Sequence, residues 1–424
     1  MMGIRKVPNE SKCHMRHCLL GALLLAASSM QAQVHPVEVP RGGRPWSSTR
    51  SAGVDADDYV YISGQGGQHP DGSMPDKFEE QASQALENVK AIVEAAGLSM
   101  EHIVYVQVYL EDVGNYEKLN GLFAKYFPSA PPARAVLGVS RLSPSSIEIN
   151  AVAVRDLTGR KPVIPPNYKS TEPFSPGILT HDRLFVSAMQ GCDPLTNTVP
   201  DDPAAQTDLA LDGVKAVVEA AGLKLTHMVF VNPYLTQKVP MRLMNEHYAR
   251  RFEFGNTPAR ATIEVTALPH NAQIEYTGVA VRDLNLRHAV RPKNMLPSPT
   301  ASPCVFAGET LYCSAKSGFI PGPNGGVYGA TTAAQLRQTM RNQLDNLEEA
   351  SMDFSQVVST TVYLDSLSDS EAFNKVYAEY FKSTFPAQTV VQQLPSSNRS
   401  PDAEGHFLEL EQLSLVAVKR PPKN

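Results

Sequence analysis

The order of apolar and polar positions recurs three times along the chain. Each block opens with an apolar run that ends in serine, at Ser63, Ser187 and Ser314, which lie 124 and 127 residues apart. A segment with apolar residues at every third or fourth position follows, over residues 85–98, 210–223 and, with a looser pattern, 340–352. This spacing predicts an amphipathic helix, and Gly97 and Gly222 suit the C-terminal cap of the first two.

Further elements recur in the same order within each block. A run rich in β-branched residues, typical of a half-buried strand, covers 102–110, 227–235 and 357–364. A second helix repeats the pattern Asn-x-x-aromatic, beginning at Asn120, Asn245 and Asn374. Terminal strands follow over 146–157, 273–284 and 408–420. A period near 125 residues with ordered landmarks predicts three tandem copies of one β-β-α-β-α-β-β domain, of mixed α/β (α+β) class.

The 424 residues would suit two to four domains on length alone, because one hydrophobic core seldom serves so long a chain. The repeats place the domains at 37–158, 165–286 and 294–421. Pro-rich stretches at 159–173 and 286–303 are predicted to be extended linkers.

Residues 1–32 have the pattern of a secretory signal peptide. Basic residues precede an apolar run of about 13 residues, which ends in small residues before Ala32. This run is shorter than the roughly 20 residues of a membrane span, although a single anchoring helix is the alternative interpretation. We therefore expect a periplasmic or secreted protein that has no membrane association once the signal is removed.

Charge and histidine placement exclude several classes of function. The formal net charge of −5 becomes about −8 without residues 1–32, which carry four basic residues and one acidic residue before the apolar run. An acidic chain without a basic stripe is not expected to bind nucleic acid. The eleven histidines show no paired ligand spacing, so we expect no metal site and no cofactor.

Two of the five cysteines could pair. Gly308 and Glu309 can form a two-residue hairpin turn, which would place Cys304 opposite Cys313 where two strands approach closely. That distance suits a disulfide, and two buried free thiols are the equally weighted alternative.

The combined landmarks resemble those of the RidA (YjgF) family of imine and enamine deaminases. The matching motifs are Ser-Gly-Gln from Ser63, the helix ends Glu-Ala-Ala-Gly-Leu, Pro-Ala-Arg at Arg134 and Arg260, Ile-Glu at Glu148 and Glu275, and residues 173–177. This resemblance implies a homotrimer of subunits of about 130 residues each, with active sites between the subunits. Three fused copies would then form a pseudotrimer from one monomeric chain.

The resemblance also implies the chemistry of the clefts. The Pro-Ala-Arg arginine would bind the carboxylate of a 2-imino acid, because a guanidinium makes two parallel hydrogen bonds to it. The glutamate of the last strand would hold the hydrolytic water. We therefore assign Glu148 and Glu275 as catalytic. The substrate-binding candidates are Arg134, Arg260, Thr262, Ser63, Ser187, Asn120, Asn245, Trp46 and Phe174.

The copies depart from the family pattern to different degrees. Copy two, with Arg260, Thr262 and Glu275, matches best, although threonine replaces the usual cysteine. Copy three is expected to be degenerate, because Gln388 replaces the arginine and the glutamate position falls at Gln412, Glu409 or Glu411. The resemblance places Trp46 and Phe174 at the family's aromatic motif, and neither carries a phenol hydroxyl.

Each candidate also has a structural interpretation. The arginines and glutamates could pair with each other across strands, the serines could cap backbone groups, and the asparagines could tie their helix to a loop. The leading hypothesis is hydrolysis of 2-imino and 2-enamino acids to 2-ketoacids and ammonia. The alternatives are a carboxylate-binding or scaffold protein without catalysis and, less favoured by the charge, a ribonuclease.

Overall fold

A computed structural model describes residues 34–39, 47, 49–166, 168, 172–196, 198–322, 325–382, 384–395, 399–402 and 405–419. The predicted signal peptide and Trp46 lie outside these residues. Among the described residues, no helix is long and apolar enough to cross a membrane.

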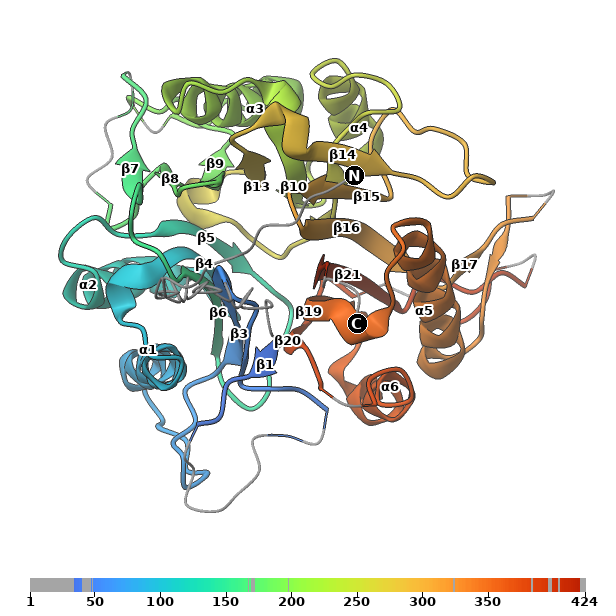
Figure 1. The fold of residues 1–424 in the computed structure, drawn as a ribbon, viewed down its shortest axis with the longest axis horizontal. Helices are drawn as coiled ribbons and strands as arrows, with labels where there is room; N and C mark the ends of the chain where they lie inside the picture. The colour runs from blue at the N-terminus through green and yellow to red at the C-terminus, as the bar shows by residue number, and fades with distance from the viewer. Residues whose placement is uncertain are drawn as a thin grey trace, which may run out of the picture. The chain divides into compact units, whose positions relative to one another are not determined.

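The first repeat folds into a mixed sheet in the order β1-β2-β3-β6-β4-β5, with two helices on one face (Figure 1). Its strands are β1 (His35–Pro36), β2 (Gly53–Asp55), β3 (Tyr59–Gln65), β4 (Ile103–Leu110), β5 (Ala133–Gly138) and β6 (Ile147–Val154). Its helices are α1 (Phe78–Ala95) and α2 (Tyr116–Tyr126). Strands β4 and β5 run parallel, so the chain must cross over between them, and α2 makes that crossover.

The second repeat forms a sheet in the order β11-β10-β13-β9-β8-β7, and β12 also pairs with β10. The strands are β7 (Lys161–Val163), β8 (Gly177–Leu179), β9 (Arg183–Gln190), β10 (Met228–Leu235), β11 (Ala259–Arg260), β12 (Ile263–Glu264) and β13 (Ile274–Val281). The helices are α3 (Pro203–Ala220) and α4 (Met241–Ala249).

The third repeat forms a sheet in the order β14-β15-β16-β21-β19-β20 and a separate hairpin of β17 and β18. Its strands are β14 (Arg287–Val290), β15 (Cys304–Ala307), β16 (Thr310–Ser317), β17 (Phe319–Ile320), β18 (Val327–Tyr328), β19 (Val357–Leu364), β20 (Ala387–Gln392) and β21 (Glu411–Val418). Its helices are α5 (Thr332–Glu349) and α6 (Ser370–Tyr377).

Short 3-10 helices complete the described elements. They are η1 (Met100–His102), η2 (Val113–Asn115), η3 (Leu225–His227), η4 (Pro269–Asn271), η5 (Leu284–Leu286), η6 (Phe354–Gln356) and η7 (Leu367–Asp369). The predicted β-β-α-β-α-β-β order and the mixed class are therefore confirmed in all three repeats. The two Pro-rich stretches are not only linkers, because β7 and β14 come from them and pair with β8 and β15.

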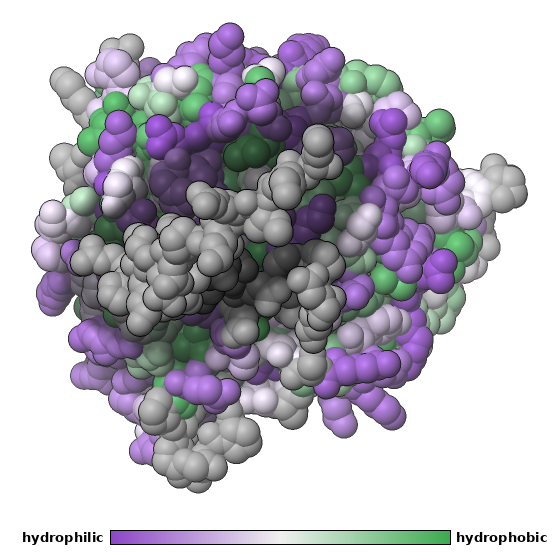
Figure 2. Space-filling view, viewed as in Figure 1, coloured by the Kyte–Doolittle hydropathy of each residue, from purple (hydrophilic) through white to green (hydrophobic). Residues whose placement is uncertain are grey.

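Each sheet buries one face against its own helices. In α1 the buried side chains follow the expected helical spacing, at Ala82, Ala85, Leu86, Val89, Ile92 and Val93. Gly97 and Gly222 adopt the left-handed conformation after their helices, with φ of +74° and +78°. In the third repeat Ser351 takes this conformation in place of glycine, with φ of +58°. The helix α5 also buries polar residues such as Gln343 and Asn346, which accounts for its looser apolar pattern. Figure 2 shows hydrophilic side chains over the outward surfaces of α5 and α6.

The opposite faces of the sheets contribute to apolar clusters shared by all three repeats. One cluster contains Val54, Ile178 and Val305, among others. A second contains Tyr109, Tyr234 and Tyr363, which occupy equivalent positions on β4, β10 and β19. The three repeats thus bury apolar surface against one another that no single repeat could cover.

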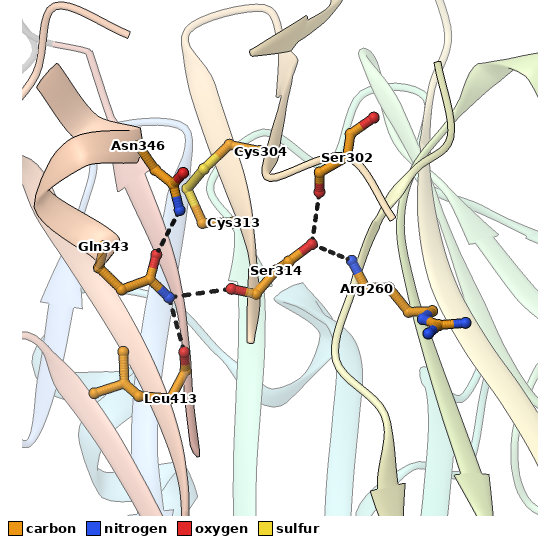
Figure 3. The surroundings of a disulfide bond; sticks show 8 residues. All are labelled: Arg260, Ser302, Cys304, Cys313, Ser314, Gln343, Asn346 and Leu413. Atoms are coloured by element: carbon orange, nitrogen blue, oxygen red, sulfur yellow. Dashed lines mark hydrogen bonds between the residues drawn. A yellow bond between two sulfur atoms is a disulfide. The ribbon is translucent and has the colours of Figure 1, made fainter. Parts of the chain in front are cut away.

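Cys304 and Cys313 form a disulfide across the hairpin of β15 and β16 (Figure 3). The two residues are directly paired in the strand register, and Gly308 and Glu309 make the two-residue turn between Ala307 and Thr310. Gly308 has a φ of +60°, which such turns require. Cys192 is the free cysteine of the described residues.

Candidate functional site

Three equivalent serines link the repeats through the backbone. Ser187 Oγ accepts a hydrogen bond from the Arg134 N–H at 2.8 Å and donates one to the Ser175 carbonyl at 2.6 Å. Ser314 makes the same pair of contacts with Arg260 and Ser302 (Figure 3). Ser63 likewise accepts from the Gln388 N–H and donates to the Ser51 carbonyl. These hydroxyls therefore serve as backbone partners, and each one joins an edge strand to the next repeat.

The strand register identifies the equivalent positions of the catalytic candidates. Glu148 lies opposite Tyr109, Glu275 opposite Tyr234, and Gln412 opposite Tyr363. Gln412 thus occupies the glutamate position of the third repeat. Its neighbour Glu411 lies on the other face of the strand and accepts a hydrogen bond from Thr339 of α5. Glu409 accepts one from Tyr328 of the small hairpin.

Each strand that carries residue 134, 260 or 388 contacts the following repeat. The residues at the arginine and glutamate positions that share a cleft therefore come from two different repeats. Arg134 of repeat 1 shares a cavity with Glu275 of repeat 2. Gln388 of repeat 3 shares another with Glu148 of repeat 1. Arg260 lies on the junction with repeat 3, where Gln412 reaches the Thr262 carbonyl. Arg260 and Glu275, paired within copy two by the sequence, therefore belong to different junctions. We name these the first (repeats 1 and 2), second (2 and 3) and third (3 and 1) clefts.

The first cleft contains a cavity of about 400 Å³. The lining residues are Tyr116, Arg134, Val136, Pro165, Tyr168, Glu172, Phe174, Ala188, Met189, Gln190, Cys192, Pro194, Leu209, Asp212, Gly213, Ala216, Pro269, His270 and Glu275. The volume suits a small organic acid, and the wall is mostly apolar with a few polar groups.

Arg134 is held in the first cleft by neutral groups and aromatic rings. Its Nη2 donates to Asn120 Oδ1 at 2.7 Å and to the Tyr116 hydroxyl at 3.2 Å. The guanidinium carbon lies 4.7 Å from the centre of the Phe123 ring and 5.1 Å from that of Phe174. Nη1 is buried and has no hydrogen-bond partner among the described residues. Arg134 forms no ion pair with a carboxylate of the described residues, so its charge is positioned to bind an anion.

Glu275 supplies a buried carboxyl group to the same cavity. Its side chain is fully buried, Oε2 accepts a weak hydrogen bond from Gln190 Nε2 at 3.4 Å, and Oε1 has no partner among the described residues. Burial raises the pKa of Glu275 to about 8, against the lowering effects of the Gln190 hydrogen bond and the charge of Arg134. A carboxyl group with such a pKa can exchange a proton with water near neutral pH.

A hydrogen-bonded chain connects the two sides of this cavity. The Tyr116 hydroxyl donates to Glu172 Oε2 at 2.7 Å, and Glu172 Oε1 lies 2.9 Å from His270 Nε2. His270 Nδ1 lies 2.8 Å from Gln190 Oε1, and Gln190 in turn reaches Glu275. The hydrogen bond with Glu172 raises the pKa of His270. His270 adopts a left-handed backbone conformation, with φ of +59°, within η4.

Sequence reasoning did not identify Tyr116, Glu172, Gln190 or His270. Tyr116 lies one helical turn before Asn120, so the spacing of α2 could have placed both on one face. Its hydroxyl also supplies a phenol to a cleft in which Phe174 has none. Glu172 lies outside the helices and strands, His270 lies in the short η4, and neither follows a recurring pattern, so no sequence signal points to them.

The serine contacts identify the residues equivalent to Phe174 in the other two repeats. Ser51, Ser175 and Ser302 each accept a hydrogen bond from the serine twelve positions later. The residues preceding them are therefore equivalent: Arg50, Phe174 and Ala301. Arg50 stands at the position equivalent to Phe174 in the first repeat. Trp46 lies outside the described residues, so its role in this cleft stays a prediction. Phe174 itself lies over Arg134, as described above.

The second cleft has the arginine without the carboxylate. Arg260 Nη1 donates to Asn245 Oδ1 at 2.7 Å, and its guanidinium carbon lies 5.1 Å from the centre of the Tyr248 ring. Thr262 Oγ1 is buried without a partner among the described residues. Gln412 replaces the glutamate, so this cleft lacks the carboxyl group found in the first.

The third cleft has the carboxylate without the arginine. Glu148 and Gln388 line it together with Asn374. Burial raises the pKa of Glu148 to about 6, opposed by the positive charge of Arg50 and by a backbone hydrogen bond from Val390. Only the first cleft, among the described residues, combines an arginine at the Pro-Ala-Arg position with a glutamate at the Ile-Glu position.

Within the described part of the chain, no group of three or more histidine, cysteine, aspartate and glutamate side chains is arranged to hold a metal ion. Cys192 lines the first cleft, where burial raises the pKa of its thiol to about 11. This cysteine is therefore a thiol, and not a thiolate nucleophile, at neutral pH.

The family model described as endoribonuclease L-PSP matches the chain three times, over residues 45–155, 166–282 and 295–397. The chain belongs to this family, which includes the RidA and YjgF proteins, and it carries three copies of the family domain in tandem. The resemblance inferred from the sequence is thus confirmed.

Curated relatives match about one repeat each. The chain is 35% identical over 124 residues to the protein DfrA of Myxococcus xanthus, which covers 28% of the chain and 93% of that protein. It is 40% identical over 112 residues to the 2-iminobutanoate/2-iminopropanoate deaminase of Escherichia coli strain K12. This match covers 26% of the chain and 88% of that protein. The relatives of single repeats therefore include an imine deaminase.

Solved structures also match single repeats. Yeast Mmf1 is 32% identical, with a TM-score of 0.28, and covers 29% of the chain and 100% of that structure. The YjgF gene product of Escherichia coli is 36% identical, with a TM-score of 0.26. The match covers 28% of the chain and 94% of that structure.

Proposed function

We propose that the first cleft hydrolyses 2-imino and 2-enamino acids to 2-ketoacids and ammonia. The observation that carries this proposal is the presence of Arg134 and Glu275 in one cavity, each with a buried polar atom that has no partner among the described residues. The name of the Escherichia coli relative, a 2-iminobutanoate/2-iminopropanoate deaminase, supports the same class of substrate.

Arg134 binds the substrate carboxylate. Its Nη1 is available, while Asn120 and Tyr116 fix the orientation of the guanidinium through Nη2. A charge-assisted hydrogen bond from a guanidinium held in one orientation strengthens the binding of the substrate acid and also fixes its position. The imine carbon, one bond from the carboxylate, is then placed toward Glu275.

Glu275 activates the attacking water. The carboxylate accepts a proton from water as the water oxygen bonds to the imine carbon, and the imine nitrogen takes a proton from solvent, which gives a carbinolamine. Glu275 returns its proton to the departing nitrogen as the carbon–nitrogen bond breaks, and the carbinolamine hydroxyl releases its proton to solvent, so the products are a ketoacid and ammonia. No net proton or electron is left over, and no cofactor is required.

The lining favours substrates with a small apolar side chain. Val136, Phe174 and Met189 face the cavity, and a polar substrate side chain would lose its hydration against them. We expect the imines of alanine and 2-aminobutyrate to be better substrates than the imine of serine or aspartate.

We also propose that the three repeats of the chain form a pseudotrimer and that the protein is exported. Serine contacts that run from repeat 1 to 2, from 2 to 3 and from 3 to 1 support a closed ring of repeats. The signal-like residues 1–32 and the Cys304–Cys313 disulfide support a periplasmic or secreted location, because disulfides persist in oxidising compartments. Small-angle scattering of an elongated monomer, or retention of the protein in the cytoplasm, would contradict these parts.

To test this function, 2-iminopropionate is generated in situ, and the release of pyruvate and ammonia by the purified protein is measured. We expect release well above the uncatalysed rate, and Arg134→Gln is expected to remove it. If wild type and Arg134→Gln give the same rate, the first cleft is not a deaminase site. Binding of pyruvate without turnover would instead favour the non-catalytic carboxylate-binding alternative, and RNA cleavage that survives repurification would favour the ribonuclease.

A further inference from the structure

The third cleft contains a cavity of about 600 Å³ with a different character from the first. Its wall includes six serine and threonine side chains, two arginines, a glutamate, two glutamines and an asparagine, against two apolar residues, Leu367 and Val390. An apolar substrate would gain little there. The polar lining would suit a ligand that forms many hydrogen bonds.

The positive charge in this cavity does not come from the usual arginine position. Gln388 stands at the position of Arg134, whereas Arg50 stands at the position of Phe174. A second arginine, Arg141, lies exposed at the same cavity. Neither guanidinium makes a hydrogen bond or ion pair within the described part of the chain, so both are free to bind an anion.

Two buried polar atoms add a requirement for hydrogen bonds. Gln388 is 2% exposed, and its Nε2, which lies near the Tyr377 hydroxyl, makes no hydrogen bond of good geometry within the described residues. Glu148 Oε1 is buried and equally without a partner there. A buried donor or acceptor left unpaired is costly, so a ligand that offers both an acceptor and a donor would be favoured.

We propose that the third cleft binds a small dicarboxylic acid bearing a hydroxyl or amino group. Its two carboxylates pair with Arg50 and Arg141, one of them also accepting from Gln388 Nε2. Its hydroxyl or amino group donates to Glu148 Oε1. This site is chemically distinct from the first cleft, which has one guanidinium and an apolar wall, and it does not depend on deamination there.

The test is isothermal titration of the purified full chain with L-malate. We expect saturable binding, and Arg50→Gln is expected to weaken it about tenfold or more, because a charge-assisted pair is removed. Succinate has the same two carboxylates but no donor for Glu148, and it should bind less tightly than malate. Gln388→Glu, which adds a negative charge to the wall, should weaken malate binding as well.

Two matched variants locate the binding. Arg341→Gln removes an equal charge from the exposed surface of α5 and is expected to leave malate affinity within about twofold. Arg134→Gln disables the first cleft and should also leave malate affinity unchanged. Circular dichroism of each variant checks that it is folded.

Failure would be unambiguous. The proposal is overturned if wild type binds no malate at millimolar concentrations, if succinate binds as tightly as malate, or if folded Arg50→Gln and Gln388→Glu both bind like wild type. It is equally overturned if Arg134→Gln abolishes binding, because malate would then occupy the first cleft. None of these results bears on whether the first cleft hydrolyses imines.

Discussion

Arg134 and Glu275 line one cavity although they belong to different repeats of the chain. The guanidinium comes from the edge strand β5 of repeat 1, and the carboxyl group comes from β13 of repeat 2. The hydrogen bond between Ser187 of β9 and the Arg134 backbone joins β5 to β9, and β9 pairs with β13 in the sheet of repeat 2. A site of this kind exists only when two repeats pack together, which links the tandem architecture directly to the proposed chemistry.

The pH dependence of turnover should follow Glu275. Its carboxyl group must be ionised to accept a proton from water, and burial raises its pKa to about 8. We therefore expect kcat/KM, corrected for uncatalysed hydrolysis, to rise with pH and to level off above about 8. Glu275→Gln should remove this rise along with most of the activity. A flat profile in the wild type would contradict the role of Glu275 as the base.

His270 is expected to position the catalytic carboxyl group through Gln190. In His270→Ala, Gln190 loses its partner at 2.8 Å and no longer presents its amide to Glu275 in one orientation. We expect kcat to fall about tenfold, the size of one lost hydrogen bond to a charged group, with little change in KM. The pH profile should also shift, because the Gln190 hydrogen bond lowers the pKa of Glu275. A merely structural role would leave that profile in place.

Glu411 should make folding stability depend on pH. Burial raises its pKa to about 8, although the Thr339 hydrogen bond opposes the rise, whereas an unfolded glutamate titrates near 4.3. Between these values the folded state holds a proton that unfolding releases, so this contribution is present at low pH and is lost as the pH rises through about 8.

Urea unfolding at pH 5 and pH 8 measures this effect. Glu411→Gln keeps the hydrogen bond but cannot ionise, so the fall in unfolding free energy between the two pH values should be smaller than in the wild type. The exposed Glu348→Gln is the control and should behave like wild type. Identical slopes in the wild type and Glu411→Gln would show that Glu411 is ionised in the folded protein.

Arg183 should be important for the packing of the repeats. Its buried guanidinium donates to the Tyr312 hydroxyl of repeat 3 at 3.0 Å and lies 4.2 Å from the Tyr59 ring centre of repeat 1. Asp182 is its ion-pair partner, at 2.7 Å. Asp182→Ala leaves a buried charge unpaired and should cost about 3–5 kcal/mol of unfolding free energy.

The double variant Asp182→Ala/Arg183→Met should recover part of that loss, because it removes the unpaired charge. Chemical denaturation followed by circular dichroism gives both values. If the double variant is less stable than Asp182→Ala alone, the desolvation argument fails.

The disulfide should stabilise the third repeat moderately. Cys304 and Cys313 close a short loop, for which chain entropy predicts about 2–3 kcal/mol. The double variant Cys304→Ala/Cys313→Ala should lower the thermal midpoint, whereas Cys192→Ala should change it less. An unchanged midpoint in the double variant would mean that the bond constrains the unfolded chain little.

The repeated elements could be predicted because local patterns determine them. The helices α1 and α3 end before Gly97 and Gly222, where an amphipathic pattern meets a residue suited to the left-handed conformation. The hairpin with Cys304 and Cys313 also follows from a local turn. Such features depend on residues close in sequence, which a single pattern can reveal.

The pairing of site residues could not be predicted in the same way. Whether Arg260 or Arg134 faces Glu275 depends on how one repeat docks on the next, and no local pattern records that. The choice among Glu409, Glu411 and Gln412 required the strand register, because a shift of one residue turns a side chain to the opposite face. Arg50 could not be recognised from the family motif, because that motif has an aromatic residue where this chain has a cation.

The most direct test compares Arg134→Gln, Arg260→Gln, Glu275→Gln and Glu148→Gln in the 2-iminopropionate assay. If the active pair spans repeats 1 and 2, Arg134→Gln and Glu275→Gln lose pyruvate release, whereas Arg260→Gln and Glu148→Gln retain most of it. Loss in Arg260→Gln with full activity in Arg134→Gln would contradict the account, because the arginine that serves Glu275 would then come from the same repeat.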